Sequence, residues 1–329
     1  MLEHVTSLDR ALLLLMPPSV VTYVLLLVVL VKQRSTPPLD SSFYRLSVSL
    51  GCLDLACLFV IYVLEKPTFW GWLVHEFFLP MDRAFNITDA RIQISQRRIS
   101  HLSYYIFGVV GWLLISQNVG ITLIAINRMM AIVMPERYKK VWTARNVGRA
   151  SAFMALGGCF FPLIEIFSDK PIVKLDANNV TAAHIKLPVL TTLLATTTCI
   201  SAACYTVAVG YLIIHNQELR REAQEERKAV FAEIRLAACG IAVFMAQLAI
   251  LSIYLLQYAR LVDSITMFKF GTVAIDLFVY MNPYFILMAS KAAREAFLKT
   301  YGCVSLSKVA PAAMTTTAPP PPPGQTARP

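Results

Sequence analysis

The sequence has little charge. Only 15% of its 329 residues are Asp, Glu, Lys or Arg, and 57% are hydrophobic; a typical soluble domain has about 25% charged and about 45–50% apolar residues. So few charged side chains cannot cover a soluble domain of this length, and much of the surface must face lipid instead of water. The composition excludes an ordinary soluble protein and indicates an integral membrane protein.

The motifs of common catalytic sites are also absent. The sequence contains no G-x-S-x-G nucleophile turn, no H-E-x-x-H zinc motif and no glycine-rich phosphate-binding pattern. All five histidines fall in expected loops or at the ends of expected spans, where they cannot assemble a buried metal cluster. We therefore predict no enzyme activity, no catalytic residues, no metal and no cofactor.

Long hydrophobic runs are present instead. Four of them contain no charged residue, and three others contain a single acidic residue each. Runs of this length span the roughly 30 Å hydrocarbon layer when they are helical. We predict an all-α membrane protein with a seven-helix transmembrane domain at 11–290 and spans at about 11–31, 46–64, 102–126, 150–166, 187–214, 236–259 and 270–290.

An odd number of spans puts the two ends of the chain on opposite sides of the membrane. If the N-terminus is outside, the inner segments carry 19 of the 30 Lys and Arg residues, as the positive-inside rule favours. The two glycosylation sequons, at Asn86 and Asn179, then both fall in outer loops. We expect residues 1–10 to form a short extracellular N-terminus and the C-terminus to lie inside.

The outer segments contain no cysteine, so no extracellular disulfide is expected. Cys303 follows the last span and is a candidate for lipidation, with a free cytosolic thiol as the alternative. It ends an expected amphipathic juxtamembrane helix at 291–303. Beyond it, residues 304–329 are rich in Thr and Pro, which indicates a disordered cytoplasmic tail that acts as a spacer or binds a partner.

Polar side chains within the spans are sparse. A carboxylate at the centre of the membrane costs about 2.5–3.5 kcal/mol on insertion scales, so such groups must face the bundle interior and form hydrogen bonds. They form either a network that rearranges during switching or structural contacts between helices. The residues concerned are Asp54, Gln117, Asn118, Asp276 and Asn282.

A second set of residues lies toward the outer ends of the third, sixth and seventh spans. Aromatic and amide side chains there predict a pocket that opens to the outside, with anchoring at the membrane interface as the alternative interpretation of each aromatic. The set comprises Tyr104, Tyr105, Trp112, Gln247, Tyr254, Gln257 and Phe270.

At the inner end of the third span stands Asn127-Arg128, followed by Pro135, Tyr138 and Trp142. This stretch, with the seven spans, resembles the nematode serpentine chemoreceptors, most closely their gamma and V classes. Further matches lie across nearly the whole bundle: Pro18-Ser19 with Tyr23, the segment 42–46, Asp54, and Asp276 through Pro283 to Arg294.

The resemblance implies a G-protein-coupled chemosensory receptor for a small-molecule cue, located in the plasma membrane and expected in sensory cilia. Arg128 stands where the receptor superfamily has a third-helix arginine that contacts the G protein when the cytoplasmic side opens. The cytoplasmic face implied to meet the G protein and membrane lipids comprises Asn127, Arg128, Pro135, Tyr138, Lys139, Lys140, Arg220 and Arg221.

Two other functions compete with this interpretation. A seven-helix ligand-gated channel subunit would have its N-terminus inside, which the two outer sequons oppose. A small-solute transporter would use Asp54 and Asp276, but no internal repeat is visible in the sequence. Neither alternative, nor the receptor, involves nucleic acid.

Overall fold

The protein is described by a computed structural model that covers residues 7–37, 39–66, 101–160, 174–176, 179–181, 187–214, 224–259, 261–262 and 264–302. Within these ranges six helices are long and apolar enough to cross a membrane. They are α1 (Ser7–Lys32), α2 (Ser42–Val60), α5 (His101–Val133), α9 (Leu187–Ile214), α11 (Gln224–Tyr258) and α12 (Ser264–Ala289).

The fourth predicted span is described only in part. Helix α7 (Ala144–Leu156) begins before it and covers its first part; the Thr143 hydroxyl accepts a hydrogen bond from the Asn146 backbone N–H at 3.4 Å. A side-chain oxygen at this position satisfies a backbone donor that the first helical turn leaves free. The remaining residues of that prediction, 161–166, lie outside the described part of the chain.

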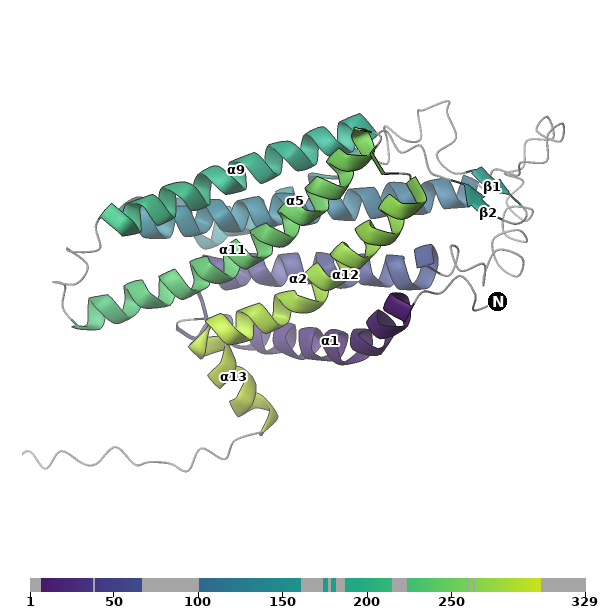
Figure 1. Cartoon of the computed structure of the whole chain (residues 1–329). Helices are drawn as coiled ribbons and strands as arrows, with labels where there is room; N and C mark the ends of the chain where they lie inside the picture. The colour runs from purple at the N-terminus through teal and green to yellow at the C-terminus, as the bar shows by residue number, and fades with distance from the viewer. Residues whose placement is uncertain are drawn as a thin grey trace, which may run out of the picture.

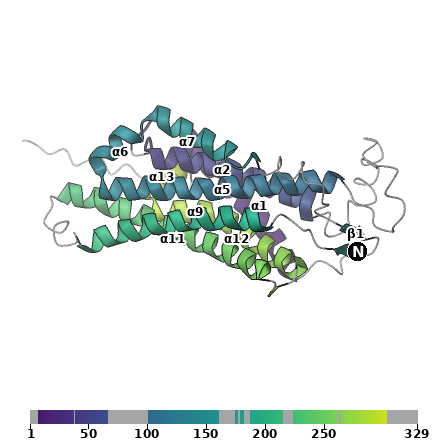
Figure 2. The same cartoon turned by 90° about the horizontal axis from the view of Figure 1, so that it is seen from above.

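The long helices lie side by side as an elongated bundle (Figure 1, and from above in Figure 2). A short antiparallel ribbon, β1 (Lys174–Asp176) and β2 (Asn179–Thr181), lies at the same end of the bundle as the start of α1. Helix α13 (Lys291–Tyr301) lies at the opposite end. The predicted all-α bundle is confirmed, and the strands among the described residues are limited to this short ribbon.

Helix α5 is the centre of the bundle. It packs against α2, α7, α9 and α11. Of the part of this helix that is apolar enough to cross the membrane, 72% is buried inside the protein, the largest share among the six described spans. It continues to Val133, beyond the predicted end at residue 126. The extension follows from burial of Asn127 and Arg128, whose polar groups find partners inside the protein.

Helix α13 is capped at both of its ends and is bonded to α1. The Ser290 hydroxyl accepts a hydrogen bond from the Ala293 backbone N–H at 3.0 Å, and Gly302, with φ of 68°, ends the helix in the left-handed region that glycine tolerates. The Tyr301 hydroxyl donates to the Leu25 carbonyl of α1 at 3.1 Å. This helix occupies the segment in which we predicted an amphipathic juxtamembrane helix, and it packs on α1 and α12.

Candidate functional site

Asp54 of α2 is the centre of the first polar cluster. Its carboxylate is completely buried and accepts three hydrogen bonds, from the Tyr23 hydroxyl of α1 at 2.5 Å, the Gln117 amide of α5 at 2.8 Å and the Asn282 amide of α12 at 2.8 Å. The Asn282 amide also lies 3.0 Å from the Tyr23 hydroxyl. Hydrogen bonds to a buried carboxylate offset its loss of hydration, so the first polar cluster ties four helices together.

A glycine lets α1 reach this carboxylate. Gly51 lies on α2 three residues before Asp54, and a Cβ atom built there would be 2.7 Å from Leu27 Cδ2 and 2.9 Å from Tyr23 Cε2. Both distances are below normal contact, so a larger residue requires the Leu27 and Tyr23 side chains to shift. The close approach brings the Tyr23 hydroxyl within hydrogen-bonding distance of Asp54.

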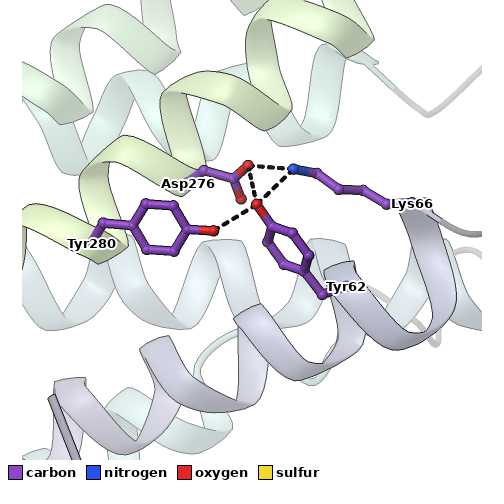
Figure 3. Close-up of polar contacts among 4 residues, drawn as sticks. All are labelled: Tyr62, Lys66, Asp276 and Tyr280. Atoms are coloured by element: carbon purple, nitrogen blue, oxygen red, sulfur yellow. Dashed lines mark hydrogen bonds and ion pairs between the residues drawn. The ribbon is translucent and has the colours of Figure 1, made fainter. Parts of the chain in front are cut away.

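The second polar cluster joins α2 to α12 through an ion pair (Figure 3). The Lys66 ammonium pairs with the Asp276 carboxylate, and their side chains are only 4% and 0% exposed. The Tyr62 hydroxyl donates to Asp276 at 2.9 Å and accepts from the Lys66 ammonium at 2.9 Å. The Tyr280 hydroxyl donates to Tyr62 at 2.5 Å, so each charge has a second polar partner.

The local backbone explains how these side chains meet. Tyr62 and Lys66 are four residues apart, as are Asp276 and Tyr280, and this spacing places each pair on one side of its helix. After α2 the chain continues as a π-helical turn, η1 (Ile61–Glu65). Such turns shift the direction of the following side chains and are frequent at functional sites. The Lys66 ammonium also lies 4.1 Å from the centre of the Tyr62 ring.

Arg128 is buried at the other end of the bundle. It is 0% exposed, donates to Asn127 Oδ1 at 2.9 Å, and its guanidinium carbon lies 4.3 Å from the centre of the Phe43 ring. The Asn127 amide donates to the Ser42 hydroxyl at 2.7 Å, and the Tyr138 hydroxyl lies 2.6 Å from the same oxygen. The start of α2 and the start of α6 (Pro135–Val141) therefore enclose the end of α5.

The sequence of this helix bundle matches a known protein family. Residues 12–303 match the family described as serpentine type 7TM GPCR chemoreceptor Srv. The chain belongs to the Srv family of serpentine chemoreceptors. The resemblance to class V is thereby confirmed, and the protein is an integral, multi-pass membrane receptor of the G-protein-coupled type. The comparison with curated proteins gives no match.

In this serpentine chemoreceptor the predicted intramembrane network divides in two. Asp54, Gln117 and Asn282 meet in the first polar cluster, whereas Asp276 belongs to the second. Asn118 joins neither through a bond found among the described residues, since its amide donates to the Leu114 carbonyl of its own helix at 2.7 Å.

Four members of the two clusters were not among the predicted network residues, namely Tyr23, Tyr62, Lys66 and Tyr280. Lys66 follows the hydrophobic run 46–64, so the sequence predicts an outer loop at this position. The four-residue spacings of Tyr62 from Lys66 and of Asp276 from Tyr280 were signals available in the sequence.

The predicted outer pocket residues have varied surroundings. Trp112 donates its indole N–H to the Ala155 carbonyl of α7 at 2.8 Å, and the Gln247 amide donates to the Thr197 hydroxyl of α9 at 3.4 Å. Tyr254 is buried, and Gln257 is half-buried. Phe270 is 58% exposed and does not point into the bundle core. The side chains of Tyr104 and Tyr105 lie outside the described residues.

Among the residues predicted for the cytoplasmic face, Pro135 is the first residue of α6, and Lys140 is exposed. Lys139 forms an exposed ion pair with Glu136 at 3.7 Å, a contact worth little in water. Arg220, Arg221 and Cys303 lie outside the described residues, as does Asn86. Asn179 begins β2, but its side chain is not described.

Gly240 allows a close contact between α9 and α11. A Cβ atom built at Gly240 would lie 2.2 Å from the Tyr205 hydroxyl oxygen, and this tyrosine is buried. We expect Gly240→Ala to destabilise the receptor by about 1–3 kcal/mol because the buried ring cannot move aside freely. Thermal unfolding of the purified protein measures the loss.

Two variants test this explanation. Adding Tyr205→Phe removes the clashing oxygen and is expected to recover part of the loss. Gly210→Ala in α9 is the matched control, because nothing lies within 4 Å of a Cβ built there and alanine favours helix. A loss in Gly210→Ala equal to that in Gly240→Ala would contradict the clash.

Proposed function

We propose that this serpentine chemoreceptor binds a small chemical cue in the outer half of its bundle and signals to a heterotrimeric G protein at the face around Arg128. The burial of Arg128 carries the proposal. An arginine that is 0% exposed cannot contact another protein until the surrounding helices separate. The burial of Arg128 therefore favours a resting state. Contact with the G protein then requires a second, open state of the receptor.

A cue activates such a receptor only if it binds the open state more tightly than the resting state. Helices α2 and α12 are joined by both polar clusters, and α12 carries Pro283 next to Asn282. Proline lacks the N–H that would complete the helix ladder, so α12 has a natural position for bending there. When the cue binds, a change in the angle of α12 carries the conformational change from the second polar cluster to the helices around Arg128.

We expect Arg128→Ala to abolish G-protein activation while surface expression persists. The measurement is nucleotide exchange on a G protein in membranes, both basal and with a panel of volatile and water-soluble small molecules. Arg149→Ala is the control, because Arg149 is an exposed arginine in α7 whose guanidinium lies 3.5 Å from Asn146 Oδ1. Unchanged exchange in Arg128→Ala would remove this arginine from the mechanism.

We also propose that the N-terminus lies outside and that the receptor resides in the plasma membrane, in sensory cilia. We expect an endoglycosidase-sensitive mobility shift that is lost in Asn86→Gln or Asn179→Gln. A label at the N-terminus gives the independent control. An N-terminal label found in the cytosol, with no glycan at either site, would reverse the orientation and favour the channel alternative.

A further inference from the structure

A cavity of about 320 Å³ lies among α1, α2 and α7, at the end of the bundle where α1 finishes and α13 packs. It is formed where α1 ends and where α2 and α7 begin, and α2 and α7 lie beside each other (Figure 2). Its volume is at the lower end of the range for small-ligand sites. None of the residues discussed above as part of the polar clusters or the Arg128 region lines it.

The polar part of this cavity is basic. Arg34 and Arg45 line it together with the hydroxyls of Ser35, Ser49 and Ser151, and no acidic residue is found among the described lining residues. Arg34 is exposed and Arg45 is half-buried, and each contributes a guanidinium group, which binds phosphate oxygens well.

The backbone adds to the positive potential. Both α2 and α7 begin at this cavity, and neither has an acidic residue in its first turn. The N-terminal ends of helices carry partial positive charge that acidic side chains usually neutralise. Two arginines and two helix N-terminal ends without an acidic residue in the first turn favour an anionic ligand.

Part of the remaining wall is apolar and reaches the outside of the bundle. Leu30, Val31, Val48 and Val147 line it; Leu30 and Val147 are buried, whereas Val31 is 48% exposed, and Val28, one turn earlier on α1, is 50% exposed. A free inorganic anion would gain no favourable contact from these apolar side chains. A molecule with an anionic head and a hydrocarbon tail matches both parts of the cavity.

We propose that this cavity binds the headgroup of an anionic phospholipid from the adjacent leaflet, which is the cytoplasmic leaflet in the proposed orientation. The phosphate pairs with Arg34 and Arg45, the Ser35 and Ser151 hydroxyls donate to the headgroup, and the acyl chains follow the exposed valines of α1. The lining residues of the cavity differ from those proposed for the cue and for the G protein.

The test uses the full-length receptor in nanodiscs of phosphatidylcholine with or without a minority fraction of phosphatidylserine. Native mass spectrometry after transfer to detergent counts retained lipids, and thermal unfolding measures their effect on stability. We expect preferential retention of phosphatidylserine and a higher melting temperature in its presence. A basic residue near an anionic surface contributes about 1 kcal/mol, so Arg34→Gln or Arg45→Gln is expected to reduce the preference about fivefold.

Matched variants separate this site from general surface charge. Arg149→Gln removes an exposed arginine of α7 that does not line the cavity and should leave the preference unchanged. Gly148 lines the cavity with nothing within 4 Å of a built Cβ, so Gly148→Trp fills the space while both arginines remain, and Gly148→Ala does not. Of these two Gly148 variants, we expect only Gly148→Trp to lose the bound lipid.

Two results would overturn the proposal. Equal phosphatidylserine preference in the wild type, Arg34→Gln and Gly148→Trp would show that the lipid does not occupy this cavity. Stabilisation of the detergent-solubilised receptor by inorganic phosphate, to the same extent as by phosphatidylserine, would identify a site for free anions. Because Arg34 is exposed, its replacement does not disturb the core and keeps the test valid if Arg45→Gln fails to fold.

Discussion

Replacing Lys66 with methionine is expected to lower the free energy of unfolding by about 3–5 kcal/mol, because it leaves the buried Asp276 carboxylate without its cation. Asp276 is completely buried, so water cannot replace the lost ammonium. Asp276→Asn should destabilise the receptor for the corresponding reason, by leaving the Lys66 ammonium unpaired. The effect is large because it reflects an uncompensated charge in a region of low dielectric constant.

Unfolding is measured by heating the detergent-solubilised receptor with a fluorogenic maleimide. The thiols of Cys57 and Cys239 are buried and react only when the bundle opens, so their labelling reports the transition. The exposed Cys52, Cys159 and Cys199 react earlier and set the baseline. Any variant that lowers stability moves the labelling transition to a lower temperature.

A double variant separates the ion pair from the effects of the individual side chains. Lys66→Met combined with Asp276→Leu removes both charges, and hydrophobic replacement of a buried pair is often neutral. We therefore expect the double variant to be more stable than either single variant. Additive losses would show that the two side chains act independently and would contradict the pair.

The matched control is the ion pair on the surface of α13. Lys291 and Glu295 lie 3.6 Å apart and are 67% and 57% exposed. Exposed pairs contribute about 0–1 kcal/mol, so Lys291→Met should leave the unfolding transition nearly unchanged. The contrast between Lys66→Met and Lys291→Met measures the contribution of burial.

The second large effect is expected at Asp54. Asp54→Leu removes the acceptor of three hydrogen bonds and leaves the donors of Tyr23, Gln117 and Asn282 buried without it. Each unsatisfied donor costs about 1–3 kcal/mol, and partial rearrangement lowers the total. We expect a loss of about 3–5 kcal/mol, measured by the same maleimide assay.

Milder variants test whether the hydrogen bonds cause this loss. Asp54→Asn keeps the shape and one oxygen acceptor, so its loss should be smaller than that of Asp54→Leu. Tyr23→Phe removes a single donor and should cost about 1.5–3 kcal/mol, because the acceptor is charged. If Asp54→Leu is as stable as the wild type, the first polar cluster does not hold the four helices together.

The two polar clusters join the same pair of helices. Asp54 and Lys66 both extend from the α2–η1 segment, while Asp276 and Asn282 both extend from α12. The two residues on α12 are six positions apart, which corresponds to about 9 Å along a helix. When α12 moves relative to α2, it must therefore either break one cluster or pivot about it. Which cluster breaks in the proposed switch depends on which of the two is less stable.

The hydrophobic spans could be predicted from the sequence because crossing a membrane depends on local composition. A run of about 20 apolar residues has few alternatives to a helix in lipid, where every backbone polar group must be paired. The same reasoning predicted that Asp54 and Asp276 face the interior, since an unpaired carboxylate in lipid is costly. Family membership also followed from short motifs that the chain carries in order, such as Asn127-Arg128 with Pro135 and Tyr138.

By itself, then, the sequence determined the helical membrane class, the receptor family and which polar residues need partners. Only the tertiary structure decided the partners: Tyr23 with Asp54, Lys66 with Asp276, and Asn127 and Phe43 with Arg128. These contacts depend on how each helix is rotated and tilted against its neighbours. Those angles are set by packing between residues far apart in the chain, such as Tyr205 against Gly240, and local sequence patterns do not contain them.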